Sequence, residues 1–235
     1  MSALVIDAEA VGDFLDKTEG FVTAEDIERW NRVMTVRLGD AADVLADDMR
    51  NLLVVPGTRR LNEGGYQLWT QHKETLKHGV IHTPGNMAAY LTSISAPPWL
   101  WEWTTFWLAA LWPDDFVWWS RWMFLPSSRT GAVPLVLVDP ECLVADPQTL
   151  YGQIVQAGHF MNHVMESLRR LPDIDPRYRH LTAFAMVYAV YLFTMTSWRL
   201  TEEFTRVLPP FPRVVASLLG IQRWEEYSIA KGKSN

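Results

Sequence analysis

The chain has 235 residues, of which 49% are apolar and 20% are charged, a balance typical of a folded globular protein and not of a disordered one. Its formal net charge is −6 at pH 7, and it has no cluster of Lys and Arg that could bind the phosphates of a nucleic acid or an anionic membrane. The single cysteine, Cys142, excludes an intrachain disulfide and a zinc site built from several cysteines. Because the N-terminus also lacks a basic region followed by a long apolar run, we expect a cytoplasmic protein.

The first clear helix signal lies at Thr23, an N-cap residue that Asp26 follows three positions later. Apolar side chains then recur at helical spacing, at Ile27, Trp30, Met34 and Leu38. The pattern is weakened at Gly39, resumes, and stops at residues 56–57. It therefore predicts either one long bent helix or two shorter helices.

Two shorter helices are expected next. Residues 62–65 predict a loop, and residues 66–77 predict a helix that a glycine ends. Thr83 and Pro84 then stand as an N-cap and a first helical residue, and they predict a helix to about Ile94.

The following segment is the most unusual part of the sequence, because eight of the 12 tryptophans lie between residues 99 and 122. Residues 99–112 carry one formal charge, Glu102, and their apolar side chains cover almost the whole circumference of a helix. Such a helix is buried in a core or in a membrane. After a break at Pro113, we expect a second aromatic helix over residues 116–124. The eight rings are those of Trp99, Trp101, Trp103, Trp107, Trp112, Trp118, Trp119 and Trp122.

The last third of the chain predicts two long helices that begin in the same way. Asp146 and Asp175 each precede a proline, which places an N-cap before a first helical residue. The first helix is expected to run to about Leu171 and the second to about Leu208, and each is followed by proline. A final short helix is expected over residues 213–224.

Strand signals are scarce. Residues 133–138 are the best candidate, but Pro134 favours an extended loop or a small hairpin over a central strand. The sequence therefore predicts an all-α fold in one domain over residues 1–235. We expect an irregular bundle of about seven to nine helices around a buried helix at residues 181–198, with a short extended segment near residues 133–138.

A membrane span is the alternative for residues 181–198, which are 18 residues without a formal charge. Arginines lie beyond both ends, so they give no signal for orientation across a bilayer. Threonine and serine side chains lower the hydrophobicity of the stretch. We therefore favour a buried helix.

The sharpest metal candidate is the pair His159 and His163, which share one helix face and could hold one divalent ion. Glu166 would add an oxygen ligand from the same helix, and Glu202 would add a fourth ligand from the next long helix. The alternative is a solvated surface, because the apolar residues of this helix gather on its opposite side.

Other chemical motifs are incomplete. His72, His78 and His82 lie at intervals that suit no single helix face, although a site on a loop would remain open to them. The sequence contains no Gly-x-Ser-x-Gly motif, no P-loop and no Gly-x-Gly-x-x-Gly motif. Cys142 has no histidine near it in sequence.

Two functions from different classes fit these observations. The one we favour is a non-catalytic binding or assembly protein that uses residues 99–122 to bind a protein partner, a second copy of itself, or an apolar or aromatic ligand. The other is a metal-dependent enzyme that acts on an apolar substrate, with the two histidines and two glutamates as ligands. The first depends on the expectation that the dense indole rings are shielded from water.

Overall fold

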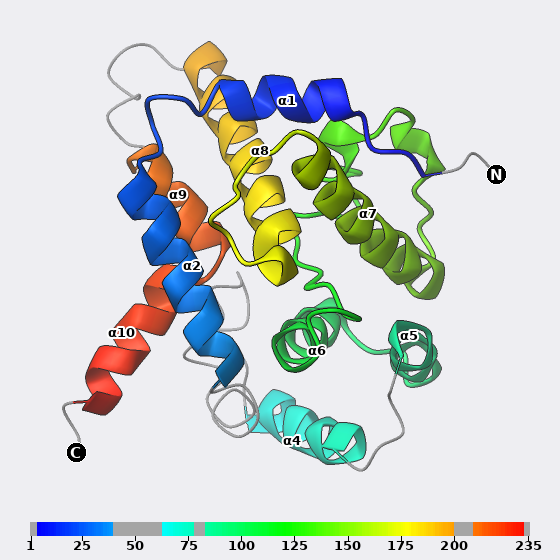
Figure 1. Ribbon diagram of the computed structural model, residues 1–235. Helices are drawn as coiled ribbons and strands as arrows, with labels where there is room; N and C mark the ends of the chain where they lie inside the picture. Colours follow the sequence, from blue (N-terminus) through cyan, green and yellow to red (C-terminus); the bar gives the residue numbers. More distant parts are fainter. Residues whose placement is uncertain (1–3, 40–62, 78–82, 200–208, 233–235) are drawn as a thin grey trace.

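The computed structural model describes residues 4–39, 63–77, 83–199 and 209–232. The α-helices in these ranges are α1 (Ala8–Asp16), α2 (Ala24–Gly39), α4 (Glu63–Lys77), α5 (Pro84–Ser93), α6 (Pro98–Leu111), α7 (Pro147–Ser167), α8 (Pro176–Arg199), α9 (Phe211–Leu218) and α10 (Ile221–Gly232). In Figure 1, α8 runs through the bundle with α1 across one end, α7 on one side, and α2, α9 and α10 on the other. The structure confirms the predicted all-α bundle.

The centre of the hydrophobic core lies on α8, within the segment that the sequence predicts as a buried helix. Every residue from Leu181 to Val190 is buried except Tyr188. α8 as a whole packs against α1, α7 and α9. Further along the helix the side chains become exposed, as at Met195. In the described part of the chain, no helix combines the length and the apolarity needed to cross a membrane.

The predicted N-caps are present. The hydroxyl of Thr23 accepts a hydrogen bond from Asp26 N at 3.2 Å, and the carboxylate of Asp26 accepts one from Thr23 N at 3.0 Å. Thr83 and Asp146 accept from the backbone N–H three residues later, at 3.2 and 2.8 Å. Asp175 accepts from the N–H two residues later at 3.0 Å. Each cap satisfies an N–H group that the first helical turn leaves without an acceptor.

Residues 116–124 do not form the second aromatic helix that the sequence predicts. Their backbone groups bond to distant side chains. Trp119 N–H donates to the hydroxyl of Thr105 at 3.0 Å. The Val117 carbonyl accepts from the hydroxyl of Tyr151 at 3.0 Å. Because these tertiary partners satisfy the backbone, the segment does not need helical hydrogen bonds, and its own spacing could not reveal this.

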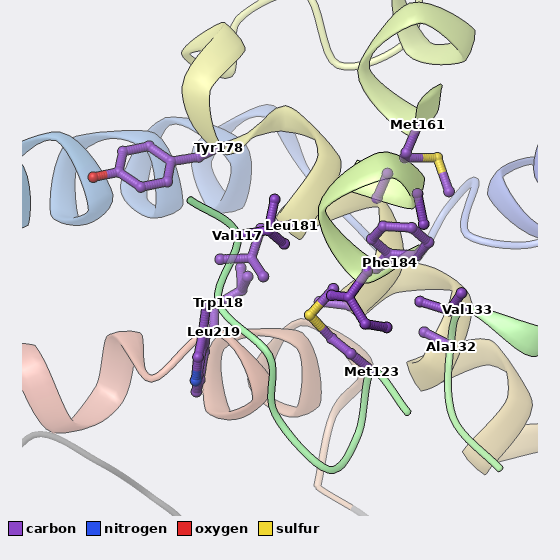
Figure 2. Packing of buried hydrophobic residues seen from close by; sticks show 14 of the residues in the cluster. Val117, Trp118, Met123, Ala132, Val133, Met161, Tyr178, Leu181, Phe184 and Leu219 are labelled. Atoms are coloured by element: carbon purple, nitrogen blue, oxygen red, sulfur yellow. The ribbon is translucent and has the colours of Figure 1, made fainter. Parts of the chain in front are cut away.

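The irregular chain from residue 116 to 133 packs into the core beside α8 (Figure 2). Gly158 of α7 permits the close approach, because a Cβ atom there would lie 2.7 Å from a methyl carbon of Val117. Gly131 has φ +143°, and a Cβ atom there would run into the backbone of Met123. Figure 2 labels core residues from the irregular chain, α7, α8 and the end of α9: Val117, Trp118, Met123, Ala132, Val133, Met161, Tyr178, Leu181, Phe184 and Leu219.

Two helix ends differ from the predictions. Gly64 and Gly65, predicted in a loop, lie in the first turn of α4, where N–H groups lack intrahelical acceptors in any case and glycine is tolerated. α7 ends at Ser167 and not near Leu171. The turn beyond it has φ +51° at Arg169, which a continuing α-helix does not allow.

The two ends of the described chain also differ. α1 was not predicted, although Asp7 caps it by accepting hydrogen bonds from Glu9 N and Ala10 N, both at 3.0 Å. Instead of one short helix over residues 213–224, α9 and α10 follow each other with Gly220 at φ +71° between them. Left-handed backbone is easy for glycine and ends a helix.

The extended segment is shorter than residues 133–138. Pro134–Val136 form one turn of 3₁₀-helix, η2, and a second such turn, η3, spans Pro140–Cys142. Leu137 is extended and makes an isolated antiparallel bridge to Ile6. Two backbone hydrogen bonds, of 2.8 and 3.1 Å, tie this segment to the N-terminal residues.

Candidate binding cleft

Seven of the eight tryptophans in residues 99–122 are shielded from water. Trp101, Trp103, Trp107 and Trp118 are buried, and Trp99, Trp119 and Trp122 are half-buried. The exception is Trp112, which is 42% exposed at the end of α6. Most of this aromatic surface therefore belongs to the core.

The aromatic rings form three rows of contacting rings that spread from α6. The first joins α6 to α4, with Trp69 at 5.4 Å from Trp103 and 5.9 Å from Trp107 between ring centroids. The second runs from Trp101 to Trp119 at 5.6 Å, and the ring of Trp119 stacks on Tyr151 of α7. The third runs through Phe106, Trp118, Trp122 and Tyr188, towards α8. Edge-to-face pairs of this kind add stabilisation beyond the area they bury.

A cleft of about 520 Å³ opens beside the second row of rings, the one that contains Trp101 and Trp119. Its aromatic walls are Trp101, Trp119 and Phe124. The Trp119 ring is fixed, because its indole N–H donates to the Phe124 carbonyl at 3.0 Å. The described residues that line it are Ala96, Pro98, Trp101, Glu102, Trp119, Ser120, Arg121, Phe124, Leu125, Pro126, Ser127, Ala145 and Pro147.

The polar feature of the cleft is Glu102, the one charge that the sequence places in residues 99–112. Its side chain is 6% exposed. Oε1 accepts a hydrogen bond from Arg121 N at 3.3 Å, and Oε2 lies 3.9 Å from Arg121 Nε, beyond hydrogen-bond distance. Burial raises the pKa of Glu102 to about 7, and the bond and the charge from Arg121 offset only part of that rise.

A second cleft, of about 420 Å³, shares Glu102, Ser120, Arg121 and Leu125 with the first. Trp118 and Trp122 line it, and their buried indole N–H groups have no hydrogen-bond acceptor among the described residues. The same carboxyl group therefore lines two clefts. Rings of the third row line the second cleft.

Three of the four predicted metal ligands lie on α7, and they do not form a metal-holding group with other described residues. His159, His163 and Glu166 are all exposed on α7, on the face that the sequence pattern assigns to solvent. Glu202 lies outside the described residues. Within the described ranges, no group of three or more His, Cys, Asp or Glu side chains is arranged to hold a metal ion.

The other described histidines, His72 and His180, do not line the cleft. His72 is buried on α4, with Nδ1 2.6 Å from the Tyr90 hydroxyl, and burial lowers its pKa. His78 and His82 lie outside the described residues. His180 was not singled out from the sequence. It is buried against α7, Nδ1 has no partner among the described residues, and burial lowers its pKa to about 3.

Sequence reasoning also missed Arg121 as the partner of Glu102. The two residues are 19 positions apart, and the intervening chain was expected to be helical. The signal that was present is the isolation of Glu102 in an otherwise uncharged stretch. Compared with known proteins, the chain matches no family model, no curated protein sequence and no solved structure.

Proposed function

We propose that this protein is a non-catalytic binding protein that holds an apolar or aromatic molecule against its Trp-rich segment. The binding site would be the cleft between α6, residues 119–127 and the start of α7. The observation that supports the proposal is the cleft itself, with two tryptophans and a phenylalanine in its walls and one buried carboxyl group. Pockets for small ligands typically have this size, with apolar walls and a few polar groups.

The composition of the cleft favours binding over catalysis. Within the part of the chain that the structure describes, no histidine and no cysteine lines the cleft. Ser120 and Ser127 have no hydrogen-bonded base among the described residues, so neither is activated as a nucleophile. Glu102 and Arg121 are the ionisable groups there, and they are suited to orienting a bound molecule.

A protein partner or a second copy of the chain is the alternative occupant. It would need a continuous apolar surface. Of the eight rings only Trp112 is exposed, and other large exposed apolar side chains in the described ranges belong to different elements, such as Phe160 on α7 and Met195 on α8. This distribution favours a small ligand. We also propose a cytoplasmic location, based on the cysteine usage of the sequence.

Isothermal titration with a panel of arylalkyl compounds tests the proposal. Ala145→Trp is the blocking variant, because Ala145 is exposed and lines the cleft. Ala89→Trp, on the exposed side of α5, is the matched control. We expect binding to the unchanged chain and to the control, and at least a tenfold loss in the blocking variant.

Two results would contradict the proposal: no compound binds, or Ala145→Trp binds as well as the unchanged chain. Native mass spectrometry of the same samples distinguishes the alternative occupant. A stable dimer that dissociates on substitution of Trp112 would favour a binding surface for a second copy.

A further inference from the structure

We infer that the cleft takes a cationic ligand, an apolar or aromatic molecule with a protonated amine, and that the Glu102 carboxylate is its counter-ion. The inference rests on the proposed function, since it names the chemical class of the molecule that the cleft would bind. It is carried by the surroundings of Glu102, by the unequal burial of Glu102 and Arg121, and by the aromatic walls.

Glu102 has unused capacity to accept hydrogen bonds. A carboxylate can accept about four. Among the described residues the Glu102 carboxylate receives one, from Arg121 N at 3.3 Å, which is long for a bond to a charged acceptor. The guanidinium is too far from Oε2 for a second. An ammonium group in the cleft would supply donors that the described residues do not provide at this position.

The difference in burial between the two charged side chains decides which charge the ligand should carry. The Glu102 side chain is 6% exposed, whereas the Arg121 side chain is 45% exposed. Arg121 can turn into solvent at little cost when a second cation enters, but Glu102 cannot leave its site. An anionic ligand would instead approach a fixed carboxylate of the same charge. The cleft therefore favours a positive head group over a negative one.

The aromatic walls act in the same direction. Trp101 and Trp119 stand edge-to-face at 5.6 Å, and both line the cleft that contains Glu102. A cation over the face of a tryptophan is attracted by the negative charge density of the ring. The same walls exclude water from an apolar body attached to the amine.

The pH dependence of binding follows from the titration of Glu102. The ionisable groups that line the two clefts containing it are Glu102, Arg121 and Tyr188. Glu102 has a pKa raised to about 7, so it is mostly protonated at pH 6 and mostly ionised at pH 8. Because apparent affinity scales with the fraction of protein that is competent to bind, the affinity for an amine rises by roughly tenfold between these pH values.

Four probes with the same body test the inference: 4-phenylbutylamine, 4-phenylbutyltrimethylammonium, 4-phenylbutan-1-ol and 4-phenylbutyrate. Titration calorimetry of the full chain at pH 6 and pH 8 gives their affinities. The primary amine stays protonated at both values, as a lysine does with a pKa of about 10.4. We expect both cations to bind at least tenfold more tightly than the alcohol at pH 8, and the butyrate to bind least.

Two variants assign the effect to the carboxylate. Glu102→Gln keeps the shape of the side chain, and we expect it to lose at least tenfold in amine affinity, to bind the alcohol as before, and to lose the pH dependence. Arg121→Gln removes the competing cation, and we expect it to bind the amine at least as tightly as the unchanged chain. If Glu102→Gln binds the amine unchanged, the inference is wrong.

The outcomes separate this inference from the proposed function. If the alcohol binds as tightly as the amine, or the butyrate binds most tightly, the cationic ligand is excluded and the binding cleft is retained. If none of the four probes binds at either pH, both are overturned. The trimethylammonium probe separates attraction between charges from hydrogen bonding, because it keeps the positive charge and cannot donate a hydrogen bond.

Discussion

Replacing Glu102 by Gln tests the free energy of burying a charge at this position. The pKa of a glutamate is near 4.5 in the unfolded chain and about 7 at Glu102 in the folded protein. Between these two values the folded state binds more protons than the unfolded state, so the free energy of unfolding falls as pH rises from about 4.5 to about 7, and it levels off above that. The loss is about 3 kcal/mol, from roughly 2.5 pKa units at 1.36 kcal/mol each.

Glu102→Gln removes this titration and keeps an oxygen that can accept from Arg121 N. We therefore expect the variant and the unchanged chain to have similar stability at pH 4.5, and the variant to be more stable by about 3 kcal/mol at pH 8. With a urea dependence of about 1–3 kcal/mol per M, the unfolding midpoint of the variant rises by about 1–3 M at pH 8 relative to the unchanged chain.

Urea unfolding followed by tryptophan fluorescence and circular dichroism measures the difference at each pH. Glu166→Gln is the matched control, because Glu166 is exposed on α7 and its replacement should change stability by less than about 0.5 kcal/mol at either pH. A stability difference between the Glu102 variant and the unchanged chain that is the same at both pH values would refute the reasoning. A variant that is less stable at pH 8 would show that Arg121 stabilises the carboxylate more than burial disfavours it.

The other predictions concern packing, one buried hydrogen bond and metal. Gly131→Ala should lower the free energy of unfolding, measured in urea, by at least about 3 kcal/mol, because it adds strain at φ +143° and a clash with the backbone. Gly152→Ala, where the added methyl meets open space on α7, should gain about 0.5–1 kcal/mol. Tyr151→Phe should lose about 1–3 kcal/mol, since the Val117 carbonyl loses a buried partner. Elemental analysis should find substoichiometric metal, unchanged in His163→Ala, because His163 is exposed.

Local signals in the sequence predicted most helix starts and the buried centre of the bundle. Asp146 and Thr83 were predicted as N-caps because each is a short polar residue directly before a proline, the pattern of a helix start. The structure shows both caps. The exposed face of α7 was predicted as one of two alternatives, because the separation of apolar from polar residues around a helix reports directly on burial. His159 is exposed for that reason.

The cleft could not be predicted, because it depends on contacts between distant parts of the chain. Residues 116–124 have the apolar density of a helix, but Thr105 and Tyr151 supply their hydrogen bonds. The spacing of apolar residues within this segment gives no information about a hydroxyl group on another helix. The pairing of Glu102 with Arg121 has the same origin, since it exists only once the irregular chain turns back over α6.

The cleft follows from the way in which α6 has to be covered. A helix that is apolar around its whole circumference needs cover on every side, and α6 receives part of that cover from an irregular segment in place of a regular helix. The segment is held by hydrogen bonds of Trp119, so its shape is fixed before any ligand arrives. It leaves a hollow against Glu102, the one charged residue of α6. A preformed hollow at a carboxyl group that the described residues leave poorly paired is the arrangement that a ligand of opposite charge completes.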